Sequence, residues 1–286
     1  MILQTRTKVT LARFAAYVIV ALRRLAGLGP FTHVKRDGFA WDLNLMDGID
    51  FSIYLLGSFE PKTQTAFKNL LKPGDIAIDV GANRGAHTLA LARAVGFEGR
   101  VIAFEPTLPA FSRLSVALEL NPDFRDRVTL KQSMLVCSSS YPLPQRIAAT
   151  WPLAFDAECD SLHMSIEETT QNASAETLDA AIAELKIQRV DFIKIDVDGF
   201  EMDVLSGGEE TLKTHSPIII LEVSPYMLEK RGLDGLSPLK FLKNLDYLFF
   251  KLNGSPLTNP ISLAKKIREG TSLNIIAMKP DTNNFS

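Results

Sequence analysis

The sequence has little cysteine. Cys137 and Cys159 are the only two in 286 residues, and two widely separated thiols form neither a metal-binding spacing nor a framework of disulfides. No secretion signal with a small-residue cleavage site is recognisable near the start of the sequence. A reducing compartment, the cytoplasm, is therefore the expected location.

Neither sign of charge is in excess. The 31 Lys and Arg residues against 33 Asp and Glu residues give a formal net charge of -2, whereas proteins that bind a nucleic-acid duplex usually present a basic face. The composition thus gives no reason to expect a nucleic acid as partner. A hydrophobic content of 46% with 22% charged residues is ordinary for a folded globular protein and excludes global disorder.

The sequence also lacks an uninterrupted apolar run of the roughly 20 residues that a membrane span needs. The nearest candidate is LARFAAYVIVALRRLAG at 11–27, which Arg13 interrupts and Arg23 and Arg24 close. Its pattern is typical of a basic amphipathic helix. Such a helix can pack on its own domain or on a second copy of the chain, giving a homo-oligomer, or it can lie on a membrane surface as a peripheral contact.

Two further features precede the main part of the chain. The stretch FTHVKRDGFAWDLNL has Asp37-Gly38 between two short alternating runs, which predicts a hairpin with a tight turn. The stretch SIYLLGSFEPKTQTAFKNLL at 52–71 reads as a helix that Pro73 and Gly74 stop. We assign residues 1–59 to an N-terminal extension of helix and hairpin, and residues 60–286 to the main domain.

The rest of the sequence alternates between strand and helix patterns. Strands are predicted at 75–80, 101–106, 127–133, 191–196 and 217–223, with helices at 86–95, 111–121, 178–186, 202–215 and 237–245. Two last strands, at 247–253 and 272–280, have no helix pattern between them. The alternation predicts an α/β fold, a doubly wound and mostly parallel sheet of seven strands with helices on both faces. The final pair predicts an antiparallel strand at or near one edge.

In such a sheet, ligands bind beyond the carboxyl ends of the strands, at the point where the strand order reverses. Chemically active residues gather at the predicted ends. The loop DVGANRG follows the first strand, Glu105 ends the second, Asp196 ends the fourth and Glu222 lies near the end of the fifth. Their shared position marks them as one candidate site.

The loop at 79–85 allows a tight turn and close approach of a ligand, since Gly81 and Gly85 have no side chain. Asn83 stands where the dinucleotide fingerprint has its second glycine, which makes an NAD-linked oxidoreductase the less favoured alternative. The Asp79 carboxylate repels a pyrophosphate but suits an ammonium or sulfonium group. Glu105 is placed to accept hydrogen bonds from ribose hydroxyls.

The stretch KIDVDGFE places Lys194 and Asp196 on one face of the fourth strand. A lysine in a strand that is buried on both faces needs a carboxylate partner, and Asp196 or Asp79 can provide it. An ion pair that merely fixes the strand end is an equal alternative. Asp198 and Glu201 open the next helix, where the backbone dipole favours negative charge, so both are interpreted as capping residues.

The segments IDVGANRGAHTLALA, VIAFEPT, TLDAAI and FIKIDVDGFEMDVLSGG resemble the FkbM family of S-adenosylmethionine-dependent methyltransferases, over roughly residues 57–221. The resemblance implies a class I methyltransferase fold, with the last strand antiparallel, and methyl transfer, commonly to a hydroxyl of a sugar or natural product. It implies further that Asp79, Gly81 and Asn83, with Gly85 in the same loop, form the methionine end of the cofactor site, and that Glu105 holds the ribose. Asp198 stands where the family more often has Glu, which leaves the role of that position open.

Methyl transfer from a sulfonium is a direct displacement. Alignment of the reactants can contribute roughly 7 to 11 kcal/mol, whereas a general base typically adds about 100- to 10,000-fold. Asp196 is the first candidate for the catalytic group, with Lys194 and Glu222 beside it; His87 and His215 are weaker candidates. Asp196 and Glu222 have the oxygen ligands that Mg²⁺ prefers, but two carboxylates are weak evidence and no metal is assigned.

The stretch at 138–175 has no clear pattern and is much longer than the usual connection of about 4 to 6 residues. It leaves the carboxyl end of the third strand and is expected to form a lid or acceptor-selecting loop. Trp151, Phe155 and His163 either face the acceptor or anchor this loop to the core. The acceptor, a small molecule or carbohydrate, stays open among sugar, glycolipid, polyketide and phenol. A cofactor-binding scaffold without catalysis is the remaining alternative.

Overall fold

The computed structural model describes residues 5–154 and 165–280. Its centre is a seven-stranded sheet in the order β12-β13-β11-β10-β3-β4-β5. The strands are β3 (Ile76–Val80), β4 (Arg100–Phe104), β5 (Val128–Lys131), β10 (Phe192–Ile195), β11 (Ile218–Val223), β12 (Leu248–Lys251) and β13 (Leu273–Met278). β13 pairs antiparallel with both β11 and β12, while the other pairs are parallel. The predicted doubly wound sheet with one reversed strand near an edge is confirmed.

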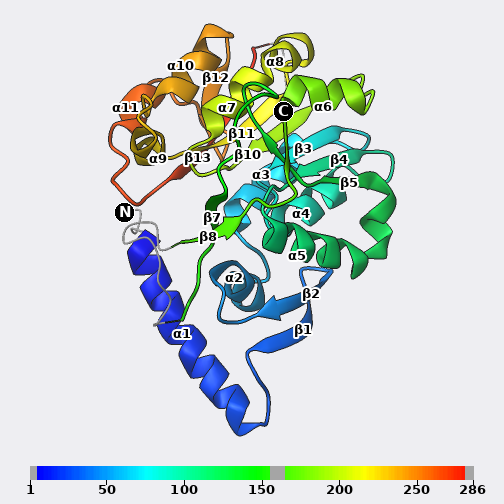
Figure 1. Cartoon of the computed structure of the whole chain (residues 1–286), viewed down its shortest axis with the longest axis vertical. Helices are drawn as coiled ribbons and strands as arrows, with labels where there is room; N and C mark the ends of the chain where they lie inside the picture. Colours follow the sequence, from blue (N-terminus) through cyan, green and yellow to red (C-terminus); the bar gives the residue numbers. More distant parts are fainter. Residues whose placement is uncertain (1–4, 155–164, 281–286) are drawn as a thin grey trace.

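Helices cover both faces of the sheet (Figure 1). They are α3 (Pro61–Leu70), α4 (Ala86–Ala94) and α5 (Leu108–Glu119) before the middle of the chain, and α6 (Leu178–Glu184), α7 (Glu201–Gly207), α8 (Glu209–His215) and α10 (Ser237–Asn244) after it. Successive side chains of β11 point to opposite faces. Ile218 and Ile220 pack in the core that contains α3 and α4, and Ile219 and Leu221 pack in the core that contains α6, α7 and α10.

The N-terminal extension consists of α1 (Thr5–Leu25), β1 (Phe31–Arg36), β2 (Phe39–Asn44) and α2 (Gly48–Leu56), drawn in blue at the lower end of Figure 1. The predicted hairpin is confirmed: β1 and β2 pair antiparallel, and Asp37 and Gly38 have φ angles of 46° and 84°, as a tight hairpin turn requires. Among the described residues, no helix combines the length and apolarity needed to cross a membrane.

The prediction of one helix over 52–71 is wrong. α2 ends at Leu56 because Gly57 adopts a left-handed conformation with φ 85°, and α3 begins at Pro61, whose ring fits the first turn of a helix but not its interior. The turn between the two helices places Glu60 at the N-terminus of α3 with φ 46°. Because of this break, Glu60 lies at the candidate site described below, whereas a continuous helix would have placed it elsewhere.

Other boundaries also differ from the predictions. The helix expected at 202–215 divides at Gly208, where a Cβ would stand 2.6 Å from the Leu178 side chain of α6. The third predicted strand divides into β5 and β6 (Ser133–Leu135), and two short helices, α9 (Pro225–Lys230) and α11 (Pro260–Ala264), were not predicted. The stretch at 138–175 contains an antiparallel pair, β7 (Arg146–Thr150) with β8 (Ile166–Thr169), and β9 (Ser174–Glu176) alongside β6. These strands are short and contain few β-branched residues, so the sequence shows no clear strand periodicity in this stretch.

Candidate active site

A cavity of about 1450 Å³ opens beyond the carboxyl ends of β3, β4, β10 and β11. Residues of the loop after β3, of β7 and of both helices of the N-terminal extension line it together with the strand ends. Pockets for one small ligand typically measure about 300 to 1,000 Å³. The cavity therefore has room for a nucleoside cofactor and a second molecule.

The glycine loop after β3 owes its shape to two left-handed glycines. Gly81 has φ 80°, and a Cβ there would stand 1.9 Å from the carbonyl oxygen of Asp196, so only glycine lets the ends of β3 and β10 approach this closely. Gly85 has φ 87°, and a Cβ there would stand 2.8 Å from the Leu114 side chain of α5. Gly81 lines the cavity, whereas Gly85 packs against α5 outside its lining.

Glu105 lies at the tip of β4, buried at the cavity wall. Its Oε2 accepts from the backbone N–H of Asn83 at 2.9 Å, and its Oε1 accepts from the N–H and hydroxyl of Thr107 at 2.8 and 2.6 Å. Burial raises the pKa of Glu105 to about 7, although these hydrogen bonds oppose the shift. The Asn83 amide donates to the carbonyl of Ala149 in β7 at 2.7 Å. The glycine loop, β4 and β7 therefore form one connected wall.

Lys194 is almost fully buried in β10, and its Nζ lies 2.8 Å from Oδ2 of Asp196. Asp79 is its register neighbour on β3. Burial disfavours the ammonium, but the carboxylates of Asp196 and Asp79 raise the pKa of Lys194 above its usual value. The expectation of a carboxylate partner for this lysine is confirmed.

Asp79 lies behind the cavity wall and is not among its lining residues. Its Oδ2 accepts from the Thr88 hydroxyl at 2.7 Å, and its Oδ1 has no hydrogen-bond partner within the described part of the chain. This position, beside Lys194, lets Asp79 act on the site through its charge. Direct contact of Asp79 with a cofactor stays a prediction.

Glu222, at the end of β11, is half-buried and lines the cavity with Asp196. Burial and the negative charge of Asp196 raise the pKa of Glu222 well above its usual range. Burial would also raise the pKa of Asp196, but Lys194 and a hydrogen bond donated by Glu222 hold it below its usual value. The two carboxyls are therefore coupled, and their surroundings shift the two pKa values in opposite directions.

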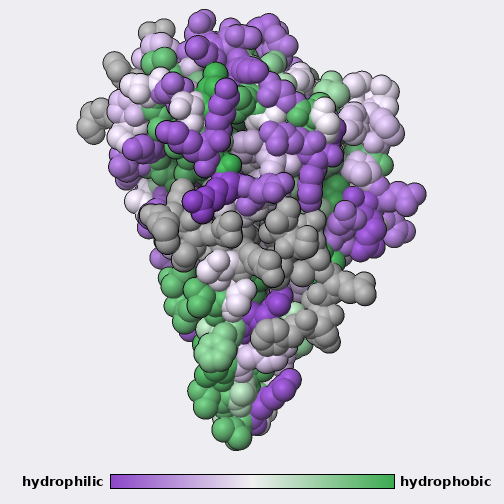
Figure 2. Space-filling model, turned by 90° about the vertical axis from the view of Figure 1, so that its left-hand side faces the viewer, coloured by the Kyte–Doolittle hydropathy of each residue, from purple (hydrophilic) through white to green (hydrophobic). Residues whose placement is uncertain are grey.

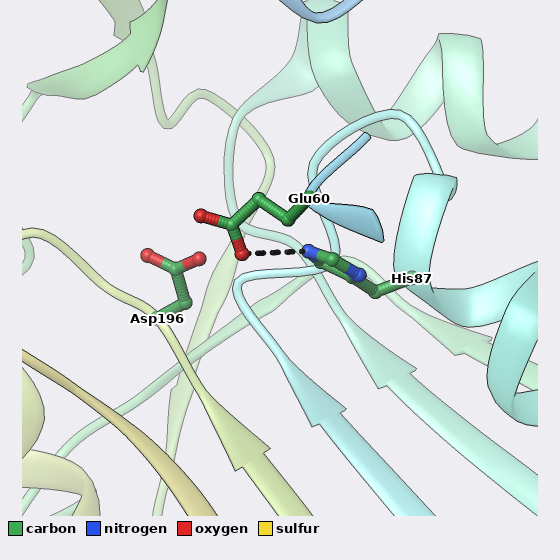
Figure 3. A group of neighbouring side chains, drawn as sticks. All are labelled: Glu60, His87 and Asp196. Carbon is green, nitrogen blue, oxygen red and sulfur yellow. Dashed lines mark ion pairs between the residues drawn. The ribbon is translucent and has the colours of Figure 1, made fainter. Parts of the chain in front are cut away.

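Glu60 and His87 complete this side of the cavity (Figure 3). Oε2 of Glu60 accepts from the Thr63 hydroxyl at 3.1 Å and from the Asn274 amide at 3.0 Å, and lies 3.5 Å from Nε2 of His87. His87 stands on α4, and Figure 3 shows its ring and the Glu60 carboxylate turned toward one another, with Asp196 opposite. Glu60 was missed from the sequence because it fell inside a predicted helix.

Other predicted residues lie at varied distances from the cavity. Trp151 lines the cavity, and its carbonyl oxygen also accepts a hydrogen bond from the backbone N–H of Gly48 at 2.8 Å, so this residue both faces the cavity and anchors the loop.

The remaining predicted residues follow β10 or lie further along the chain. Asp198 lines the cavity in a left-handed conformation with φ 45°. Glu201 is buried outside the lining, and its Oε1 accepts from the N–H of Gly199 at 3.0 Å. His215 ends α8 away from the lining. Phe155 and His163 lie outside the described residues.

The N-terminal extension is fastened to the main domain next to the glycine loop. The buried guanidinium of Arg84 lies 2.8 Å from Asp47 and 3.2 Å from Asp50, and Arg113 of α5 lies 2.5 Å from Asp50. Asp47 is also the N-cap of α2, where it accepts from the first helical N–H groups. Both regions expected from the sequence, 1–59 and 60–286, therefore line the same cavity.

The sheet order, the reversed β13 and a cavity beyond the strand ends define a class I S-adenosylmethionine-dependent methyltransferase fold. The family model described as the methyltransferase FkbM domain matches residues 79–249, more than half of the chain. The chain belongs to the FkbM methyltransferase family, as its sequence motifs predicted. No curated protein matches the chain.

Three solved structures illustrate the likeness of fold. FkbM methyltransferase from Methylobacillus flagellatus KT shares 16% identity over 74% of this chain and 47% of its own, with a TM-score of 0.44, so this chain spans about half of its length. A putative rRNA methylase from Clostridium thermocellum shares 16% sequence identity over 76% of this chain and 93% of its own, with a TM-score of 0.45. An S-adenosylmethionine-dependent O-methyltransferase from Thermotoga maritima shares 18% sequence identity over 90% of this chain and 81% of its own, with a TM-score of 0.42.

Proposed function

We propose that this protein transfers the methyl group of S-adenosylmethionine to a hydroxyl of a sugar, glycolipid or natural product. The observation that carries the proposal is the continuity of one cavity. Glu105 and the glycine loop line it together with the cluster of Lys194, Asp196 and Glu222, and we call the first set the nucleoside end and the second the acceptor end. The first is suited to a nucleoside and the second to a polar acceptor.

The residues at the nucleoside end fit the cofactor. Both oxygens of Glu105 are held in place by donors from Asn83 and Thr107. A carboxylate has about four acceptor positions, and these three hydrogen bonds occupy three of them. One position on Oε2 is left for a ribose hydroxyl. Gly81 and Asn83 line the cavity beside it. When bound, the cofactor supplies an electrophilic methyl group on a sulfonium.

At the acceptor end, Asp196 is the group best placed to orient a hydroxyl. Because Lys194 and Glu222 hold its pKa low in spite of burial, Asp196 stays ionised and is a weak proton acceptor but a strong hydrogen-bond acceptor. Its role is therefore to align the acceptor oxygen, which is the larger contribution in a direct displacement. Lys194 fixes the Asp196 carboxylate, and Glu222 lies next to it.

The test is a transfer assay on the full chain with methyl-labelled S-adenosylmethionine and a panel of sugars, glycolipids, polyketides and phenols. Products that gain one methyl group on oxygen, identified by mass spectrometry and NMR, support the proposal. Methylation on nitrogen or carbon contradicts it. Cofactor binding by calorimetry without transfer to any member of the panel favours the scaffold alternative, and tighter binding of NAD than of S-adenosylmethionine favours the oxidoreductase.

A further inference from the structure

Glu60, His87 and Asp196 come from three separate segments and meet at one side of the cavity (Figure 3). One carboxylate oxygen from each acid and one ring nitrogen of the histidine all lie within 4.8 Å of one another. Ligands of a single Zn²⁺ stand about 2.0 to 2.2 Å from the ion, and hence about 3 to 4 Å from each other. Small side-chain movements therefore suffice for the three groups to share an ion.

His87 has a buried ring whose polar atoms are unsatisfied. Only 5% of the residue is exposed, and neither ring nitrogen has a hydrogen-bond partner in the part of the chain that the structure describes. Phe59 and Phe67 flank the ring, with centroids 5.6 and 5.5 Å away. Buried polar groups without partners are rare and costly.

The charges around this point do not balance. Four acidic side chains, those of Glu60, Asp79, Asp196 and Glu222, lie around a single lysine, Lys194. A bound divalent cation would offset part of this acidic excess.

The two carboxylates are also held in place as metal ligands usually are. Thr63 and Asn274 donate to Glu60, and Lys194 donates to Asp196. Outer hydrogen bonds of this kind orient ligating groups toward a shared ion. The two carboxylates are thus arranged before any ion binds.

We propose that Glu60, His87 and Asp196 bind one divalent first-row transition-metal ion, such as Mn²⁺ or Zn²⁺, at the acceptor end of the cavity. An imidazole with two carboxylates suits these ions, whereas Mg²⁺ prefers a set made only of oxygen ligands. The site itself follows from the geometry, but its role rests on the proposed function: the ion would bind the acceptor hydroxyl and lower its pKa.

The experiment measures metal binding without reference to turnover. Full-length protein is freed of metal with a chelator and titrated with Mn²⁺ and Zn²⁺ by calorimetry, and Mn²⁺ binding is followed by electron paramagnetic resonance. We expect one ion per chain, and affinities at least tenfold lower in His87→Gln and in Glu60→Gln. His33→Gln, a change of an exposed histidine on β1, is the matched control and should bind as the wild type does.

Two results would overturn the proposal: no binding of either ion by the wild type, or equal binding by His87→Gln and Glu60→Gln. Circular dichroism establishes that each variant is folded. Methyl transfer by the metal-free protein, measured separately, tells whether the reaction needs the ion. A wild type that binds metal but transfers no methyl group to oxygen refutes the proposed function and leaves the metal site standing.

A second, independent observation concerns α1. One side of this helix packs on the molecule through Val9, Ala16 and Val20, while the other exposes an apolar row at helical spacing, seen as the green area at the lower end of Figure 2. The exposed row consists of Leu11, Phe14, Val18, Leu22 and Leu25. Leu11 also lines the cavity, as do the exposed Leu55 and Leu56 of α2. The apolar surface therefore reaches the mouth of the site.

The charge of α1 indicates what this surface contacts. The helix contains Arg6, Lys8, Arg13, Arg23 and Arg24 and no acidic residue. Two copies of the chain meeting through this face would bring together two helices that each contain basic residues and no acidic residue to pair with them. An anionic lipid surface is complementary both to the apolar row and to the net positive charge of the helix.

We infer that α1 lies on an anionic lipid surface, with the cavity mouth facing the membrane and open to a lipid-linked acceptor. The test is flotation of the full chain with phosphatidylcholine vesicles that contain or lack phosphatidylserine. The wild type should float with the anionic vesicles, and the double variant Phe14→Ser, Leu22→Ser should not. Phe97→Ser, a change of an exposed aromatic residue after α4, should float like the wild type. Absence of flotation, or a dimer seen by light scattering that the double variant abolishes, would overturn the inference.

Discussion

Gly81 and Asp196 lie so close together that a Cβ on the glycine would stand 1.9 Å from the aspartate carbonyl oxygen. The glycine loop after β3 and the carboxylate at the end of β10 are therefore one structure, although more than a hundred residues separate them in the sequence. The approach of these two backbones brings the glycine loop next to the strand end that carries Asp196.

Gly81→Ala tests this contact. The variant should be less stable than Gly57→Ala by at least about 2 kcal/mol, because both positions are left-handed and cost about 1 to 2 kcal/mol for an alanine, but only Gly81 adds a backbone collision. Gly57 has φ 85° and nothing within 4 Å of its Cβ position, so it is the matched control. Denaturant unfolding measures both. Equal stabilities for the two variants would show that the loop relaxes without cost.

Lys194→Met should lower the free energy of unfolding by about 3 to 5 kcal/mol, since it leaves the Asp196 and Asp79 carboxylates buried without their cation. Thermal and urea unfolding measure the change. Lys213→Met, which removes an exposed lysine paired with Glu209 on α8, should leave stability almost unchanged. A Lys194→Met protein as stable as the wild type would mean that the ion pair is not needed to fix this strand end.

Asp196→Asn should reduce turnover by about 100-fold or more while cofactor affinity changes little, because the amide keeps the size of the side chain but loses its charge. Steady-state kinetics with a responsive acceptor and calorimetry with S-adenosylmethionine measure the two effects. Asp191→Asn, at the other end of the same strand, should keep normal turnover. Near-normal turnover in Asp196→Asn would restrict the residue to a structural role.

Glu105 should make cofactor binding depend on pH. Burial raises its pKa to about 7, so the carboxylate that accepts a ribose hydroxyl is present above that pH and is lost as pH falls through it. Affinity for S-adenosylmethionine should therefore be lower at pH 6 than at pH 8. Glu105→Ala should weaken binding by about 1.5 to 3 kcal/mol at pH 8 and remove the pH dependence. Calorimetry at both pH values checks this, and Glu98→Gln, at an exposed turn, is the control.

Glu201 predicts a pH effect on stability. Burial raises its pKa from 4.5 to about 7 in the folded protein. Since the folded state holds this proton more tightly than the unfolded state, stability falls as pH rises from about 4.5 to about 7 and is constant above. Glu201→Gln lacks this loss and should be more stable than the wild type at pH 8, by roughly 2 to 3 kcal/mol, with a smaller difference at pH 5. Thermal unfolding of both proteins at both pH values measures this difference in stability. A difference between variant and wild type that does not change with pH would contradict the prediction.

The sheet was predictable because its strands are short buried runs that alternate with helices, and the one reversed strand was predictable from the missing helix pattern before it. The strand-end residues Glu105, Asp196 and Glu222 followed from the topology alone, since parallel strands end at the same edge. All three line the cavity. The local sequence pattern was sufficient to predict the position of a residue wherever that position depends only on the strand to which the residue belongs.

Glu60 could not be found in this way. Its place depends on Gly57 and Pro61, which break a pattern that otherwise has helical periodicity, and on a partner, Asn274, at the far end of the sequence. The inward position of Asp79 was equally hidden, because a strand-tip carboxylate can face the cavity or its neighbour, and only the register of β3 with β10 decides. Contacts between segments that are far apart in the sequence produce no periodic pattern of residues, so sequence periodicity does not predict them.

The bond between Asn274 and Glu60 has a consequence for how the protein forms during synthesis. It spans 214 positions, and Asn274 belongs to β13, which is made after β12 but inserts between β12 and β11. A growing chain on the ribosome thus has its cofactor loop and most of its sheet before the strand that orients Glu60 has emerged. Activity should appear all at once, when β13 enters the sheet, and not in proportion to the length of chain that has been translated.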